Sequence, residues 1–353
     1  MNAFQRASGV ALLVLLASSC AEESVTDVSG AKELKNFGPS FLVANASVDI
    51  HFELGEAGPA DIWYFPGKIH LQDDWSSSGP YDHFVVVNAL ATPAYNYPTF
   101  GLQSLRISNA VTSGSFGDQT FSKRTPNHAG ETESSCLPPL CQGTRQSHFE
   151  VEQDFASTVP AAEQPGLAVT VSPDRGDGAR MSFYRLRDTP TGLAVDFVDV
   201  QGVEIPAGDV CGEANFTETT VATGLNRAVP HTIKLTMDLL EGPSNDIVKV
   251  YVDGSLRHTG TSWEDYYRYD CEAVAHGGNP PAVNRILYRT SSVPNAPLTL
   301  LHGFVFDNLS LGTSNAAAAK DDCKNGGWQS LTRADGTPFK NQGDCIQYTN
   351  KGK

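Results

Sequence analysis

The sequence predicts an all-β protein, an antiparallel two-sheet jelly-roll sandwich followed by a small C-terminal appendage held by a disulfide. Hydrophobicity alternates over short segments between about residues 37 and 314, and long helical periods are few. The segments between are rich in Gly, Pro, Asn and Asp, which are turn formers. Many short strands separated by turn signals are typical of a sandwich or jelly roll.

The expected strands are segments in which one set of alternate residues is apolar, as in a half-buried strand. They are 83–88, 104–108, 148–155, 167–172, 179–186, 192–199, 231–239, 247–252, 285–289 and 303–311. Asp253 and Gly254 form a strong hairpin signal after the segment 247–252. A further short strand is expected after that turn.

The N-terminus has the layout of an export signal. The apolar core, Gly9 to Ala17, is shorter than the roughly 20 residues that a spanning helix needs. Small residues precede Cys20, an arrangement that resembles the bacterial lipoprotein lipobox, although Ala17 stands where leucine is usual. The resemblance implies a lipoprotein signal peptide over 1–19 and lipidation of Cys20. Ordinary signal cleavage near the same point is the alternative.

A polar segment over 20–36 is expected to be a tether between the lipid and the fold. The expected location is therefore the bacterial cell envelope, at the outer membrane or the cell surface. Contact with a membrane is expected through the N-terminal lipid only.

The cysteines support an exported protein. The chain has seven, and removing Cys20 leaves six, an even number that suits disulfides in an oxidising compartment. Proximity or a shared module favours three pairs, although the sequence leaves other pairings open: Cys136 with Cys141, Cys211 with Cys271, and Cys323 with Cys345. Zinc is disfavoured because the run CLPPLC has no second pair at close spacing.

The negative charge of the chain argues against a nucleic-acid partner. Forty acidic residues against 25 basic ones give a net charge of −15. Such a field repels nucleic acid and anionic lipid headgroups, and no basic cluster offsets it. A nucleic-acid partner is not expected. The sequence does not predict the oligomeric state.

The hairpin at 230–259, with its VKVYVDG run, resembles the hairpin of LamG-like and other concanavalin A-like lectin/glucanase jelly rolls. The segment Gly303–Leu311 resembles the final strand of many such domains. This resemblance implies a jelly roll over 37–314 but no function, because the fold hosts lectins, hydrolases, lyases and adhesion modules. The segments 104–122 and 262–268 resemble exported bacterial proteins of unassigned function.

The C-terminal segment reads as a separate small module. A linker of small residues over 315–320 precedes 321–353, which resembles a short module appended to exported bacterial proteins. Gly326-Gly327-Trp328 and the run 339–343 carry the resemblance. So short a segment buries little core, and a disulfide between its two cysteines would compensate. A surface contact and a capped tail are both open as its role.

Residues 149–155, FEVEQDF, carry a row of acids. In a strand, Glu150, Glu152 and Asp154 share one face, with neighbours about 6.6–6.8 Å apart. Glycoside hydrolases use carboxylates about 5–5.5 Å apart for retention and about 6.5–9.5 Å apart for inversion. The run resembles the acid strand of concanavalin A-like glucanases, which implies Glu150 as nucleophile, Glu152 as its modulator and Asp154 as acid. The order of Glu and Asp differs from that family's pattern, and a solvated or metal-holding face is favoured.

The run SWEDYYRYD is the richest candidate binding site, expected as a loop over 262–270. Aromatic rings stack on sugar faces while polar groups satisfy the hydroxyls. The predicted ligand-binding residues are Trp263, Glu264, Asp265, Tyr266, Tyr267 and Arg268. The alternative is that these rings cover an end of the core. Further aromatics lie in loop-rich sequence at Trp63, Tyr64, Trp75 and Tyr81.

Calcium is the one cofactor that the sequence suggests, and the loop 172–178 is its first candidate site. Asp174 and Asp177 lie there among glycines, and oxygen-rich loops of this kind can hold calcium, although a plain turn is favoured. Asp253 and Asp307 could also ligate calcium, but each is better explained as a turn residue. Motifs of hydrolytic triads, zinc proteases and nucleotide-binding loops do not occur in the sequence.

We therefore expect a cell-surface lipoprotein that binds carbohydrate non-catalytically. A glycoside hydrolase or polysaccharide lyase using the Glu150/Glu152/Asp154 strand is the alternative. A structural surface protein without a small ligand is the third interpretation.

Overall fold

The computed structural model describes residues 47–53, 74–79, 82–90, 97–290, 301–315 and 323–351, apart from 114, 116, 135, 180, 275–277, 325, 330, 332 and 334–336. The predicted signal peptide, Cys20, the tether, most of the 315–320 linker and Trp63, Tyr64 and Tyr81 lie outside the described residues.

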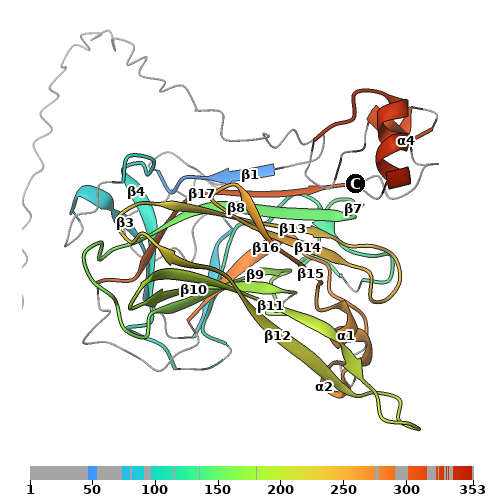
Figure 1. Cartoon of the computed structure of the whole chain (residues 1–353), viewed down its shortest axis with the longest axis horizontal. Coiled ribbons are helices and arrows are strands. Elements are labelled where there is room, and N and C mark those ends of the chain that lie inside the picture. The colour runs from blue at the N-terminus through green and yellow to red at the C-terminus, as the bar shows by residue number, and fades with distance from the viewer. Residues whose placement is uncertain are drawn as a thin grey trace, which may run out of the picture. The chain divides into compact units, whose positions relative to one another are not determined.

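The fold is the predicted two-sheet antiparallel sandwich (Figure 1). One sheet has eight strands, in the order β15 (Ser255–Gly260), β14 (Ile247–Val252), β13 (His231–Asp238), β8 (His148–Ser157), β17 (Phe304–Ser314), β4 (Gln103–Ser108) and β3 (Asp82–Val87), with β1 (Ser47–Ile50) also paired to β17. The other has seven: β12 (Glu213–Leu225), β11 (Gly192–Glu204), β10 (Phe183–Thr189), β9 (Ala168–Asp174), β16 (Arg285–Arg289), β5 (Gln119–Phe121) and β2 (Ser76–Ser78). Two short strands, β6 (His128–Ala129) and β7 (Arg145–Gln146), pair in parallel.

The core lies between the two sheets and follows the period of two expected for strands. In β8 the inward residues Phe149, Val151 and Phe155 are at most 1% exposed and belong to the main apolar cluster. Tyr184 and Tyr288 face them from the seven-stranded sheet, each at most 1% exposed. These rings and the opposite strands form a continuous apolar layer.

One polar side chain crosses this layer and joins the two sheets. Gln153 on β8 is fully buried; its Nε2 donates to the Tyr184 hydroxyl at 2.5 Å, and its Oε1 accepts from the Tyr288 hydroxyl at 2.6 Å. Because both polar ends of the amide are satisfied, its burial carries little penalty. The contacts also fix which face of β10 and of β16 points into the core.

The structure corrects several local predictions. The strand β12 was missed, as were the short strands β1, β2 and β5 to β7. The strand β9 continues through Pro173 to Asp174, so the expected loop at 172–178 begins only after the strand. The expected loop at 262–270 is helical: α1 covers Glu264–Tyr269 and α2 covers Cys271–Val274. Asp307 is not a turn residue but lies inside β17.

The other helices within the described residues are η1 (Asn88–Leu90), η2 (Gly327–Gln329) and α4 (Gln342–Lys351). In the described part of the chain no helix has the length and apolarity needed to span a bilayer.

Three disulfides form, and they are the pairs preferred from the sequence: Cys136–Cys141, Cys211–Cys271 and Cys323–Cys345. The last one staples the small C-terminal segment, where both cysteines are buried with Phe339. Arg333 adds an ion pair to Asp344 on α4 at 2.7 Å. A disulfide and a few buried side chains are the devices expected where a segment is too short for a core of its own.

Candidate functional site

The helix α1 divides the predicted ligand-binding residues into two groups. Residues three or four apart share a face of a helix. Trp263, Tyr266 and Tyr267 therefore project together, and all three line a groove on the outer face of the seven-stranded sheet. Glu264 and Arg268 share another face and belong to a buried polar network. Asp265, 7% exposed, accepts a hydrogen bond from Ser244 at 2.8 Å.

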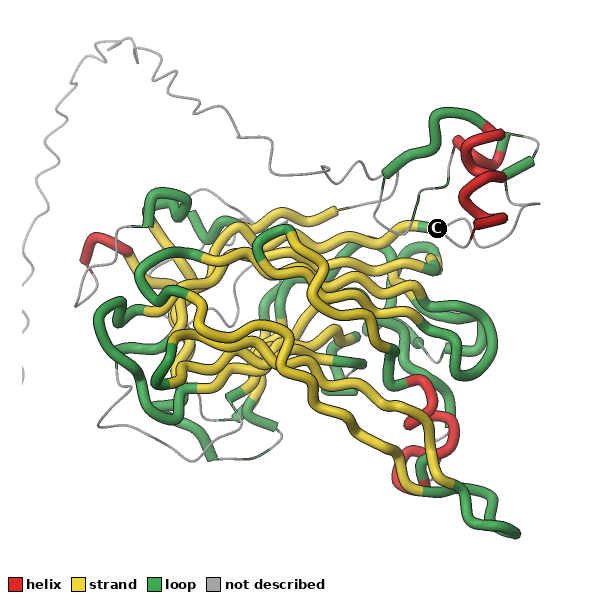
Figure 2. Tube along the Cα trace, in the orientation of Figure 1, coloured by secondary structure: helices red, strands yellow, loops and turns green. Residues whose placement is uncertain are grey.

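The groove has a volume of about 530 Å³. It is lined by Thr170, Gly178, Phe183, Arg185, Val198, Phe216, Trp263, Tyr266, Tyr267, Glu272 and Arg289. Its floor comes from alternate, outward residues of β9, β10, β11 and β16, and its wall comes from β12 and the two short helices. Figure 2 shows β11 and β12 running side by side toward these helices.

Covalent and polar links hold that wall in place. The Cys211–Cys271 disulfide joins the β11–β12 connection to α2. The Gly212 amide donates to the Tyr269 carbonyl at 2.9 Å, and the Ala214 amide donates to Asp270 at 2.8 Å. The first residues of β12 are thereby fixed beside α1. A fixed wall keeps the groove formed in the free protein, which lowers the entropy cost of binding.

The rings in the groove have different roles. Trp263 is only 6% exposed, packs edge-on against Phe183 and Phe216, and donates from Nε1 to the Val198 carbonyl at 3.3 Å. It is therefore mainly a packing residue. Phe216 on β12 is 47% exposed and lies 5.5 Å from the Tyr266 ring. The ring faces open to a ligand come from Phe216, Tyr266 and Tyr267.

Two arginines stand on the floor of the groove. In the sheet, Arg185 on β10 and Arg289 on β16 pair with the same residue, Thr170 on β9. Arg185 forms an ion pair with Glu218 at 2.9 Å and lies 5.7 Å from the Phe183 ring centroid. Arg289 is 7% exposed, and burial lowers the pKa of its guanidinium against the attraction of Asp118.

The predicted calcium residues lie at the edge of this region. Asp177 lines an adjoining pocket of about 370 Å³ and accepts from Arg175 at 2.7 Å. Asp174 is fully buried at the end of β9, and burial raises the pKa of its carboxyl to about 7. Among the described residues, the acids close enough to hold one ion together do not include these two. Calcium at this loop stays a prediction.

The acid strand lies on the other sheet. Glu150, Glu152 and Asp154 share the outer face of β8, opposite the core residues of the same strand. Lys234 forms an ion pair with Glu150 at 2.6 Å. Asp154 accepts hydrogen bonds from Thr232 at 2.6 Å and Asn308 at 2.8 Å.

Burial sets the acidity of two members of the row. It raises the pKa of Glu152, opposed by Lys234 and supported by the other acids of the strand. It also raises the pKa of Asp154, against the two hydrogen bonds that this carboxyl accepts. These carboxyls are therefore suited to hold a proton, but they lie on the sheet opposite to the aromatic groove.

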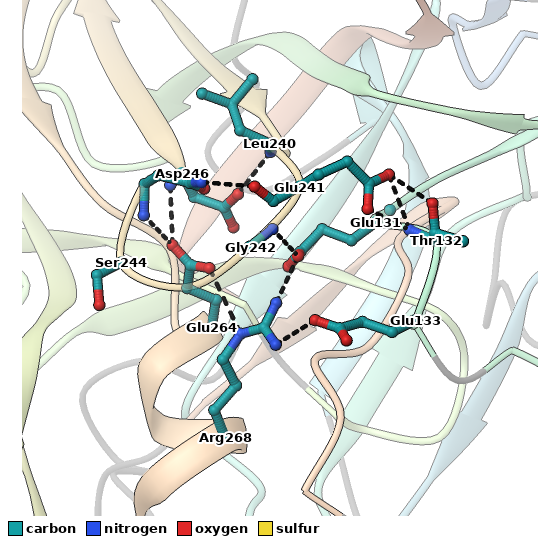
Figure 3. A network of polar contacts seen from close by, with 12 residues as sticks. Glu131, Thr132, Glu133, Leu240, Glu241, Gly242, Ser244, Asp246, Glu264 and Arg268 are labelled. Atoms are coloured by element: carbon teal, nitrogen blue, oxygen red, sulfur yellow. Dashed lines mark hydrogen bonds and ion pairs between the residues drawn. The ribbon is translucent and has the colours of Figure 1, made fainter.

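A second cluster of acids was not predicted. Ligand atoms of Glu131, Asp246 and Glu264 lie within 4.8 Å of one another, and all three residues are buried. Arg268 contacts Glu131 and Glu133 and lies 3.7 Å from Glu264 (Figure 3). Burial raises the pKa of Glu131 to about 7 and that of Asp246 well above its usual value. Carboxylate oxygens in this arrangement could ligate a hard cation. They could instead share protons next to the guanidinium of Arg268.

A further buried acid, Asp307, adjoins the acid strand. It pairs with Asp154 across β17 and β8, is fully buried, and accepts from the Gly101 amide at 3.1 Å. Burial raises the pKa of its carboxyl to about 8. A bulge follows at Asn308, whose φ is 50°. The bulge explains why the sequence there resembled a turn.

Comparison with known proteins gives remote likenesses only. No protein-family model and no curated protein matches the chain. An endo-β-1,4-glucuronan lyase from the fungus Trichoderma reesei is 14% identical over 71% of this chain and 95% of its own, with a TM-score of 0.38. The alginate lyase Aly36B, as a mutant with alginate tetrasaccharide, is 10% identical over 77% and 98%, with a TM-score of 0.39.

A galectin from Caenorhabditis elegans is also similar, 12% identical over 57% of this chain and 99% of its own, with a TM-score of 0.25. At such identities and scores, none of these structures assigns an activity or a residue role to this chain.

Proposed function

We propose that this chain is an exported, lipid-anchored envelope protein that binds carbohydrate without cleaving it, through the aromatic groove on its seven-stranded sheet. The observation that carries the proposal is the groove itself. It combines exposed ring faces with charged and hydroxyl groups in one concave site of about 530 Å³. Sugar sites need this combination, because rings stack on the apolar faces of a pyranose and polar groups bond its hydroxyls.

The proposed location is supported by the sequence and by the disulfides. The segment 1–19 has the layout of a lipoprotein signal, and Cys20 follows it. The remaining cysteines all pair in three disulfides. Disulfides persist in oxidising compartments and are rare in the cytosol of mesophiles. Mass spectrometry of the protein from its native membrane, showing an unmodified Cys20, would remove the anchor from this proposal.

The main alternative is a glycoside hydrolase or polysaccharide lyase that uses the acid strand. The raised pKa values of Glu152 and Asp154 favour it, because a general acid must hold its proton. Against it, Glu150 is 3% exposed and paired with Lys234, whereas a nucleophile must reach the sugar. The non-catalytic choice therefore rests on where the rings are: they line the opposite sheet.

One experiment separates these functions. The purified protein is incubated with a panel of polysaccharides, and both retention and new reducing or unsaturated chain ends are measured. We expect retention without new ends, weakened in Phe216→Ala. Phe216 is preferred to Trp263 for this test because its ring is exposed and its loss leaves a smaller defect in the packing.

The possible outcomes point in different directions. New chain ends that disappear in Glu150→Gln would establish the hydrolase or lyase and contradict the proposal. New ends that persist in Glu150→Gln would contradict it as well and place the chemistry on residues other than Glu150. Absence of retention on every glycan would leave a structural surface protein.

A further inference from the structure

The lining of the groove on the seven-stranded sheet has more basic than acidic side chains, although the protein as a whole is acidic. Its lining includes two arginines, Arg185 and Arg289, and one carboxylate, Glu272. The whole chain carries a net charge of −15. Cationic side chains gathered in a concave site of an acidic protein focus a local positive potential there. Such a site selects an anionic group on the ligand.

The two arginines are placed to act on one group. Arg185 and Arg289 lie in the strands on either side of β9, and both pair with Thr170. Adjacent strands are about 4.8 Å apart, so the two arginine Cα atoms are separated by about 10 Å. Thr170 is short, and the long arginine side chains can approach each other above it. A carboxylate over Thr170 would be within reach of both guanidinium groups.

The core holds the arginines in this position. Each follows a tyrosine, Tyr184 before Arg185 and Tyr288 before Arg289. The hydroxyls of both tyrosines contact the buried amide of Gln153 on the opposite sheet. Because side chains alternate along a strand, fixing the tyrosines inward fixes the arginines outward. The floor is therefore formed in the absence of a ligand.

The guanidinium of Arg185 can bind a ligand anion in place of its present partner. Its ion pair is to Glu218, whose side chain is 48% exposed, and exposed ion pairs contribute little. Its Nε atom is buried and has no hydrogen-bond acceptor among the described residues. A planar guanidinium binds a carboxylate through two parallel hydrogen bonds. A ligand carboxylate can therefore replace Glu218 at the guanidinium of Arg185.

We propose that the groove recognises a glycan built from uronic acids. One uronate carboxylate binds between Arg185 and Arg289 above Thr170, and pyranose rings lie against Phe216 and Tyr266. This inference rests on the proposed function and adds the class of sugar to it. A neutral sugar would desolvate the same two guanidinium groups without supplying an opposite charge, so it binds more weakly.

The test uses calorimetry on the full-length protein with matched oligosaccharides. The probes are oligogalacturonate, oligomannuronate and oligoglucuronate, each beside its carboxyl-reduced counterpart, which keeps the same backbone without the charge. A sulfated neutral oligosaccharide is a further arm. We expect at least one uronate to bind about tenfold or more tighter than its reduced form, since a charged hydrogen bond contributes about 1.5–3 kcal/mol. Added salt should weaken this preference.

Variants locate the carboxylate. Arg185→Gln and Arg289→Gln should each remove most of the preference for the uronate over its reduced form. Arg257→Gln is the control, because it removes the same charge from an exposed position on β15, outside the groove. Thermal melts by circular dichroism show whether each variant is folded. Because Arg289 is buried, Arg185→Gln, with a partly exposed side chain, keeps the test valid if Arg289→Gln unfolds.

Each contrary outcome has a distinct meaning. Equal binding of uronate and reduced oligosaccharides would overturn the inference and leave carbohydrate binding intact. Equal binding of the sulfated probe and the uronates would overturn the assignment to carboxylates. A uronate preference unchanged in folded Arg185→Gln would place the carboxylate elsewhere and also overturn it. Failure of every oligosaccharide, charged or reduced, to bind would remove the proposed function itself.

Discussion

Replacing Lys234 by methionine tests whether the acid strand is a charge-balanced structural face. The Lys234 ammonium lies 2.6 Å from Glu150, and the two side chains are 15% and 4% exposed. Methionine keeps an unbranched stem of similar length and removes the charge. The Glu150 carboxylate would then remain buried beside Glu152 without its cation. Breaking a buried pair in this way is strongly destabilising, by about 3–5 kcal/mol.

The loss of stability in Lys234→Met can also be calculated from the free energy of protonating the unpaired carboxyl. A carboxyl that loses its cation escapes the penalty by binding a proton. For a glutamate of ordinary pKa about 4.3, this costs about 3.7 kcal/mol at pH 7 and about 1 kcal/mol at pH 5. The loss of stability in Lys234→Met is therefore limited to about 3–4 kcal/mol at pH 7. It should shrink toward about 1 kcal/mol at pH 5, because protonation there is cheaper.

Thermal or urea unfolding of the wild type and Lys234→Met at both pH values measures this. For a domain over 37–314, with an unfolding entropy of about 2.1 cal/mol/K per residue, about 3.7 kcal/mol corresponds to a melting temperature lower by about 6 °C at pH 7. The double variant Lys234→Met/Glu150→Gln should recover much of the loss, because the uncompensated charge is gone. A loss below about 1 kcal/mol at pH 7, or one equal at pH 5 and pH 7, would refute this reasoning.

Three further predictions concern the groove and the buried acids. Phe216→Ala should weaken glycan binding about twofold to twelvefold by calorimetry, since stacking contacts contribute about 0.5–1.5 kcal/mol. The melting temperature should change little because the ring is 47% exposed. Unchanged affinity would contradict the role assigned to this ring. Replacing Cys211 and Cys271 by serine should reduce the affinity for the glycan, because β12 in the wall of the groove loses its covalent link to α2. Unchanged affinity would show that the hydrogen bonds between β12 and the helices hold the wall without the disulfide. Burial raises the pKa of Glu131 to about 7 and that of Asp307 to about 8. The folded protein therefore holds these protons at low pH and loses their stabilising contribution as the pH rises through these values. The melting temperature should fall between about pH 5 and pH 8, and less steeply in Glu131→Gln; a rise in melting temperature over this range would contradict both pKa shifts.

Much of the fold could be predicted because apolar and polar residues alternate clearly along the strands of the core. In β8, large apolar residues at 149, 151 and 155 leave one possible inward face, and the structure buries it. The strand β12 escaped prediction because it is an edge strand whose residues are all partly or fully exposed. Its sequence, EANFTETTVATGL, lacks a continuous apolar face, and burial is what creates the alternating signal.

The site was predictable only in part. Three residues of the aromatic run at 263–267 line the groove, and their role in binding stays a prediction. A six-residue helix was not expected there, so the sequence did not separate the residues that line the groove from those of the buried polar network. Phe216 was missed together with its strand. A signal for Arg185 and Arg289 was present: each follows a tyrosine in an expected strand, so an inward tyrosine implies an outward arginine. That both flank Thr170 depends on strand order, which the local sequence does not encode.

The central claim is that the groove on the seven-stranded sheet is the carbohydrate site. The most direct measurement is an NMR titration of isotope-labelled protein with oligogalacturonate, oligomannuronate, oligoglucuronate and their carboxyl-reduced forms. We predict saturable shifts confined to Thr170, Phe216 and α1, largest with a uronate. Saturable shifts centred instead on Glu150 and Lys234, or no shifts with any of these sugars, would contradict the account.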